Sequence, residues 1–104
     1  MAVLVIAEVE GQNEELYDAM IAVLGPMLRQ AKGFIAQGAG PAGPGSPGRD
    51  VWRGFEVWES AADATRFFAQ YVHPNLPPGV KPRRTLVELH SLVLAGSAPL
   101  APSR

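Results

Sequence analysis

VWRGFEVWE, residues 51–59, is the stretch that shows most clearly how the chain folds. Aromatic and β-branched residues dominate it, which is the composition of a half-buried strand. Working outward, AVLVIAEV at residues 2–9 is an apolar run typical of a strand buried on at least one face. FIAQGA at residues 34–39 is a weaker strand candidate, and TLVELHSLVL at residues 85–94 is the last. The sequence therefore predicts four strands.

Two amphipathic helices are expected between these strands. The first follows Asn13, whose side chain can cap a helix, and its apolar residues recur at helical spacing as far as Pro26. Because proline lacks the N–H group and clashes with the preceding turn, we expect a kink or a restart there and an end near residues 32–33. The second helix follows Ser60 and should stop before Pro74. The apolar face of this second helix consists of Ala64, Phe67, Phe68 and Tyr71.

The expected order of elements is β-α-β-β-α-β within one domain, residues 1–95. This order is typical of the ferredoxin-like α+β fold, in which an antiparallel four-stranded sheet carries both helices on one face. Residues 40–50 are rich in glycine and proline, so we expect a flexible loop there, and a lid over a site is one role for such a loop. The tail, residues 96–104, has no periodicity and is expected to fray.

The composition excludes several classes of protein and of site. Among the 104 residues, nine Lys and Arg stand against ten Asp and Glu, and a net charge of −1 gives no overall field that attracts nucleic acid. The chain has no cysteine, which removes disulfides, thiolate metal sites and cysteine nucleophiles. The apolar runs are too short to span a bilayer, and nothing resembles a secretory signal. We therefore expect a cytoplasmic protein that binds neither nucleic acid nor a membrane.

Alternation along the strands divides their residues between two faces of the sheet. The face expected to pack against the helices and form the core includes Val3, Val5, Phe55, Val57 and Val87. The opposite face is too apolar for water and too polar for a dry core, so we expect it to pair with a second copy and enclose a part-polar cavity. A homodimer is the direct consequence. The residues of this opposite face are Leu4, Ile6, Glu8, Trp52, Glu56, Trp58, Leu86, Glu88, His90 and Leu92.

Three short segments resemble one known family. AVLVIAEVEG at residues 2–11, FEVWES at residues 55–60 and VELHSLV at residues 87–93 are similar to the dimeric α+β barrel superfamily, which contains the antibiotic biosynthesis monooxygenases. The resemblance covers residues 2–94. It implies a homodimer formed through the sheets, with a cavity between sheet and helices or within the barrel. Some members oxidise aromatic polyketides with neither metal nor flavin, and others degrade haem or isomerise lactones.

The resemblance also bears on individual residues. Members that oxidise aromatic or haem substrates often carry a tryptophan at the end of the third strand, and Trp58 is similar in position. The asparagine that accompanies it would fall near the end of the first strand, where this chain has Ala7 and Glu8. This departure counts against both the quinone-forming and the haem-degrading activities. The axial histidine of haem-degrading members lies on or just after the second helix, close to where His73 precedes Pro74.

Among the polar residues, His90 is the strongest candidate for proton transfer, because histidine exchanges protons near neutral pH. Glu88 or Glu56 could orient it, and together with Glu8 these acids could act as general bases with raised pKa values. The alternative for His90 is a structural histidine, and for the acids it is a solvated rim or ion pairs in a dimer. The residues expected to contact substrate are Trp52, Trp58, Tyr71, Leu86 and Leu92.

These features predict a small-molecule tailoring enzyme of secondary metabolism. It would be a cofactor-independent monooxygenase or a cyclase/isomerase acting on an aromatic or polyketide-like substrate in the cavity, with no metal or other cofactor. The expected partners are a second copy of the chain and a small apolar or aromatic ligand. Two alternatives remain open: a non-catalytic, ligand-binding or stress-related dimer, and a haem-binding or haem-degrading protein.

Overall fold

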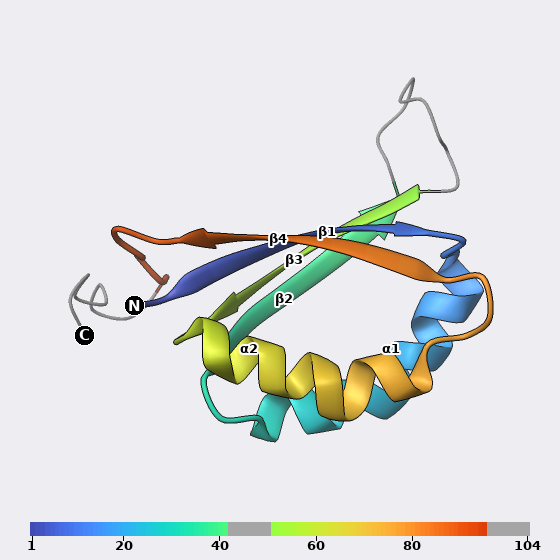
Figure 1. The fold of residues 1–104 in the computed structure, drawn as a ribbon, viewed down its shortest axis with the longest axis horizontal. Coiled ribbons are helices and arrows are strands. Elements are labelled where there is room, and N and C mark those ends of the chain that lie inside the picture. Colours follow the sequence, from blue (N-terminus) through green and yellow to red (C-terminus); the bar gives the residue numbers. More distant parts are fainter. Residues whose placement is uncertain (42–50, 96–104) are drawn as a thin grey trace.

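Residues 1–41 and 51–95 are described by a computed structural model of the protein. They form a four-stranded antiparallel sheet with both helices packed on one of its faces (Figure 1). The elements in chain order are β1 (Val3–Glu10), α1 (Glu14–Gln30), β2 (Phe34–Pro41), β3 (Val51–Trp58), α2 (Ala61–Phe67) and β4 (Lys81–Glu88). Beyond α2 the chain continues as a π-helical segment, Phe68–Val72, and a 3-10 turn, His73–Asn75.

The strands lie in the order β2-β3-β1-β4, so the strands that are first and third in sequence form the centre of the sheet. All three pairings are antiparallel, and β1 pairs with β3 along its whole length without a shift in register. A β-bulge between Phe34 and Ala36 interrupts the pairing of β2 with β3. The expected ferredoxin-like α+β fold is confirmed.

The fourth strand is displaced from its expected position. It was predicted over residues 85–94, whereas β4 begins at Lys81 and ends at Glu88. The segment before residue 85 contains Pro82, and proline is uncommon inside a strand. An edge strand tolerates proline and lysine because one side of its backbone needs no partner. Leu92 lies beyond β4 and forms only an isolated bridge.

The glycine- and proline-rich segment is only partly within the described residues. Gly40 and Pro41, expected at the start of the loop at residues 40–50, belong to β2. The remainder of that loop and the tail at residues 96–104 lie outside the described residues.

Helix α1 begins where its capping residue predicts. Asn13 Oδ1 accepts a hydrogen bond from the Leu16 N–H at 2.8 Å, which confirms the expected N-cap. Pro26 lies inside the helix, which continues to Gln30 and so ends slightly before the expected boundary. Gly33 then turns the chain with a φ of +83°, a conformation that strains residues with a Cβ.

Helix α2 also has its expected cap, because Ser60 Oγ accepts from the Asp63 N–H at 3.1 Å. The hydrogen bond with the Ser60 side chain, followed by that from Arg66, lowers the pKa of the Asp63 carboxyl despite its burial. The helical path does not stop before Pro74, because a 3-10 turn carries it on to Asn75.

Replacing the helix cap by Ser60→Ala should lower the free energy of unfolding by about 1 kcal/mol, because the Asp63 N–H loses its acceptor. The folded-state pKa of Asp63 is depressed, so its contribution is present above the ordinary aspartate pKa and is lost as the pH falls through the folded value. Urea unfolding near neutral pH and in acid should therefore show a smaller effect in acid. Ser91→Ala, at an exposed position outside the helices, is the control and should change neither value.

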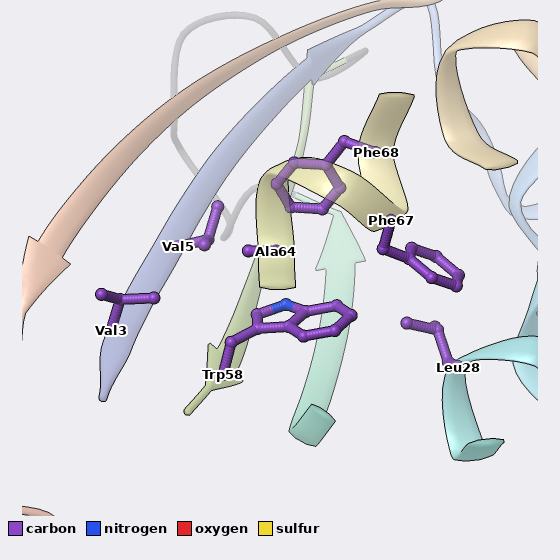
Figure 2. Packing of buried hydrophobic residues seen from close by; sticks show 7 residues of the cluster. All are labelled: Val3, Val5, Leu28, Trp58, Ala64, Phe67 and Phe68. Atoms are coloured by element: carbon purple, nitrogen blue, oxygen red, sulfur yellow. The ribbon is translucent and has the colours of Figure 1, made fainter. Parts of the chain in front are cut away.

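The core lies between the sheet and the two helices, and Trp58 is at its centre (Figure 2). Trp58 is fully buried, and its ring meets Phe34, Phe67 and Phe68 at centroid distances of 5.4, 5.6 and 6.3 Å. These separations suit tilted and edge-to-face aromatic packing. Figure 2 shows the members of this core cluster: Val3, Val5, Leu28, Trp58, Ala64, Phe67 and Phe68.

The expected assignment of faces is right for β1 and wrong for β3 and β4. Val5 faces the helices, and its direct partners are Glu56 on β3 and Leu86 on β4. Directly paired residues point to the same side of a sheet. Four residues that were expected on the outer face therefore lie on the helix side: Trp52, Glu56, Trp58 and Leu86. Phe55, Val57 and Val87, expected in the core, lie on the outer face with Leu4 and Ile6.

The outer face, away from the helices, is apolar at its centre. Ile6, Phe55 and Val87 remain 42%, 46% and 42% exposed there. The Phe55 ring lies over Gly38 of β2, where a Cβ would stand 2.7 Å from the ring carbon Cε1. Large apolar side chains are thus exposed next to one another on this face, since Phe55 is the direct partner of Ile6.

Candidate functional site

A cavity lies between the helix side of the sheet and the two helices, with a volume of about 90 Å³. That is several times the space that one water needs but below the size of a typical drug pocket, so it admits about one aromatic ring. Its walls are mainly apolar. The apolar side chains come from both layers and include Val5, Val9, Leu24, Leu28, Phe67 and Val80.

Glu56 is the acidic residue of this cavity. It sits on the central strand β3, and its side chain faces the helices because Glu56 pairs with Val5. Burial raises the pKa of the Glu56 carboxyl, while a hydrogen bond from Trp58 and the charge of Arg84 act in the opposite direction. The Trp58 Nε1–H donates to Glu56 Oε1 at 2.7 Å. The hydrogen bond from Trp58 therefore fixes the position of the Glu56 carboxyl group. Because this group is desolvated, it can take up a proton closer to neutral pH than an exposed glutamate does.

Arg84 places a positive charge on the wall of the same cavity. It lies on β4 opposite Ala7, and burial lowers its pKa while Glu56 opposes that shift. Its guanidinium carbon is 4.1 Å from the centroid of the Phe68 ring, and its Nη1 is 3.0 Å from His73 Nε2. The cation–π contact and the contact with His73 hold the guanidinium in one place. Arg84 can thus face negative charge that develops in the cavity.

An aromatic wall lies further along the cavity, near the end of β1. Trp52 pairs with Val9 and packs against Tyr17 of α1, with ring centroids 5.1 Å apart. Gln37 of β2 donates from Nε2 to the Tyr17 hydroxyl at 2.9 Å. A flat ring and a fixed hydroxyl suit the binding of an aromatic ligand.

Of the expected catalytic residues, the cavity contains Glu56 alone. Glu8 lies on the outer face, where it pairs with Arg83 at 3.1 Å and Arg53 at 3.9 Å. Glu88 is exposed at the end of β4, and His90 is exposed beyond it; neither lines the cavity. The expected orientation of His90 by Glu56 finds no support in this arrangement, and the catalytic role of His90 stays a prediction.

The expected substrate-binding residues divide in the same way. Trp52 lines the cavity, and Trp58 lies beside it as the donor to Glu56. Tyr71 is 38% exposed, with its ring against Phe67 at 5.1 Å. Leu86 is 44% exposed at the edge of the sheet. Tyr71, Leu86 and Leu92 do not line the cavity.

Sequence reasoning missed four polar residues of the cavity. Arg84 precedes the strand expected at residues 85–94, and a correct strand boundary places it on the sheet. Tyr17 lies among the apolar residues of α1, which gives no sign that its hydroxyl lines a cavity. No sequence signal identified Gln12 or Gln37, because a single glutamine in a strand or turn has no characteristic pattern.

The described residues contain no group of three or more His, Cys, Asp or Glu arranged to hold a metal. Within residues 1–41 and 51–95, no helix is long and apolar enough to cross a membrane.

No protein-family model and no curated protein matches the sequence. Solved structures nevertheless share the fold. The cofactor-independent oxygenase SnoaB from Streptomyces nogalater matches with a TM-score of 0.64 and 12% identity over 83% of this chain and 90% of its own. A dimeric ferredoxin-like protein of unknown function from Jannaschia sp. matches with a TM-score of 0.57 and 13% identity over 82% of this chain and 98% of its own.

The hydroxynitrile lyase from Passiflora edulis matches with a TM-score of 0.56 and 16% identity over 83% of this chain and 93% of its own. Identities this low establish the shared fold and nothing finer. The chain has the ferredoxin-like α+β fold that these solved structures share.

Proposed function

We propose that the protein is an enzyme that removes a proton from a small, largely apolar aromatic substrate, with Glu56 as the general base. One observation carries this proposal: a half-buried carboxyl group with a raised pKa stands in a mainly apolar cavity. Placing a desolvated carboxylate there costs stability, and perturbed pKa values of this kind cluster at catalytic sites. A base with a raised pKa is also a better proton acceptor near neutral pH.

The reaction favoured is a cofactor-independent oxygenation, and a cyclisation or isomerisation would begin with the same proton transfer. Glu56 would take a proton from a hydroxylated ring or an acidic methylene, and Arg84 would stabilise the anion. The anion would reduce O₂ and combine with it to form a peroxide. Loss of water then leaves a quinone, so one oxygen atom enters the product, the other leaves as water, and the substrate supplies the electrons.

The likeness to SnoaB supports this choice at the level of fold, because the same scaffold holds a cofactor-independent oxygenase there. Oxygen uptake should be measured with resorcinol, 1-naphthol and anthrone, which carry acidic hydroxyl or methylene groups and increase in size. Uptake with formation of a quinone absorbance supports the oxygenase. Binding of these compounds without turnover would favour the alternative of a non-catalytic ligand-binding protein.

The hydrogen bond from Trp58 to Glu56 should be visible in the pH dependence of turnover. Because this bond lowers the pKa of Glu56, Trp58→Phe should raise it further. The base acts when deprotonated, so the acidic limb of the pH–rate profile should move to higher pH. Trp52→Phe is the matched control, because Trp58 and not Trp52 donates to Glu56, and it should leave this limb in place. An unmoved limb in Trp58→Phe would contradict the assignment of Glu56 as the base.

We further propose that two copies of the chain pair through the outer face of the sheet. The support is the apolar centre formed by Ile6, Phe55 and Val87, flanked by the ion pairs of Glu8. A dimeric ferredoxin-like protein shares the fold. This pairing uses the opposite face of β3 from the one first expected, so the interface and the cavity of Glu56 lie on different sides of the sheet.

Phe55→Lys should weaken this dimer by at least about tenfold, because a charge would be buried at the centre of the interface. Light scattering across a dilution series measures the change. Val23→Lys makes a similar substitution at a 57% exposed valine on α1 and should leave the mass unchanged. A wild-type chain that is monomeric at every concentration would refute the pairing.

A further inference from the structure

One end of the cavity holds a polar group that the proposed reaction does not use. Gln12 follows β1, lines the cavity and is 5% exposed. Its Oε1 is buried and accepts no hydrogen bond from any residue that the structure describes. Buried carbonyl oxygens are nearly always paired, because giving up water without a replacement donor is unfavourable. No N–H or O–H group of the described residues therefore donates to this oxygen.

The other uncharged polar side chains of the cavity do not pair with this oxygen. Gln37 and Tyr17 line the same cavity, where Gln37 donates to the Tyr17 hydroxyl at 2.9 Å, and neither side chain is hydrogen-bonded to Gln12 Oε1. The turn that carries Gln12 is also tightly enclosed, since a Cβ at Gly11 would collide with the carbonyl oxygen of Gly79. The position of Gln12 is thus fixed by close backbone packing.

The register of the sheet separates Gln12 from the proposed base. Glu56 lies opposite Val5 and Trp52 opposite Val9, so about 13 Å of strand separates them. Gln12 comes after β1 has passed Val9, and it therefore lies toward the Trp52 end of the cavity. The Glu56 carboxyl group and Gln12 Oε1 therefore lie toward different ends of the same cavity.

We infer that Gln12 determines substrate specificity by accepting a hydrogen bond from a hydroxyl or N–H group on an aromatic ring that packs near Trp52. This inference rests on the proposed function of the cavity and narrows its substrate class to arenes that carry a donor remote from the reacting carbon. A site built around an acceptor discriminates against the analogue without the donor, because that analogue leaves the buried oxygen unpaired.

The test compares two ring-sized probes, p-cresol and p-xylene, which differ by a hydroxyl in place of a methyl group. Their dissociation constants are measured by ¹H–¹⁵N NMR titration for the wild-type chain and for Gln12→Met, which keeps the side-chain length and removes the acceptor. The ratio of the p-xylene constant to the p-cresol constant should fall about tenfold in Gln12→Met. Gln12→Leu, a second apolar variant, should give the same fall.

Two controls separate this inference from the proposed reaction. Gln30→Met makes the same change at an exposed position on α1 and should leave the ratio as in the wild type. Glu56→Gln should also preserve the ratio, since no turnover is measured. The inference is overturned if Gln12→Met keeps the wild-type ratio, if Glu56→Gln abolishes the preference instead, or if neither probe shifts the signals of cavity residues.

Discussion

Turnover by Glu56→Gln is expected to fall by about 10²–10⁴-fold, the usual contribution of a general base. The substitution is nearly isosteric, and a glutamine oxygen can still accept the hydrogen bond from Trp58 Nε1. Substrate binding should therefore change little, so the loss should appear in kcat. Steady-state kinetics with the substrate found by oxygen uptake measure it. An unchanged kcat would remove Glu56 from the mechanism.

The same substitution should make the chain more stable near neutral pH, which separates lost chemistry from lost folding. The folded-state pKa of Glu56 is raised, so stability falls as the pH rises from the ordinary glutamate pKa through the folded value. Glu56→Gln removes this dependence. Its thermal unfolding midpoint should exceed that of the wild type near pH 7 and approach it in acid. Glu88→Gln, an exposed glutamate at the end of β4, is the control for both measurements.

Trp58→Ala should lower the free energy of unfolding by about 3–5 kcal/mol, because a fully buried ring is removed from the centre of the core. Domains of this kind are stable by only about 5–15 kcal/mol, so the variant will be close to unfolding at room temperature. The loss includes the hydrogen bond that the buried Glu56 carboxyl receives. Urea unfolding followed by circular dichroism, at one protein concentration, measures the change.

Trp52→Ala is the matched control for this experiment. Trp52 is half-buried at the wall of the cavity, whereas Trp58 is surrounded by packed rings. Its replacement should cost less than half as much, because its wall already borders empty space. Equal losses for the two tryptophans would show that Trp58 is not the centre of the core.

The order of elements could be predicted because it depends on local chemistry. Asn13 and Ser60 cap helices through hydrogen bonds to residues three positions away, and such signals are complete within a few residues of chain. Alternation in residues 51–59 was equally readable. The fourth strand was misplaced because Pro82 reads as a break, and only a position at the edge of the sheet makes it acceptable.

The candidate site was harder to predict because it depends on pairing between distant strands. Alternation shows that Trp58 and Glu56 share a face, but not that this face meets the helices. The apolar side chains of Phe55 and Val57 favoured the alternating set of β3 residues that includes them as the helix-facing one, and this assignment is wrong. The pairing of Val5 with Glu56 decides the matter, and it joins positions about fifty residues apart. Arg84 reaches the cavity for the same reason, through its pairing with Ala7.

The glycine beneath the Phe55 ring has a consequence for how closely two molecules can approach. Since Gly38 has no side chain, the ring can lie flat across β2 instead of standing upright. Facing sheets pack about 10 Å apart, a spacing that tolerates flat rings but not a raised one. In the proposed dimer, a valine at this position would displace the Phe55 ring and hold the two molecules further apart. The distance between the two sheets of the proposed dimer therefore depends on the absence of a side chain at Gly38.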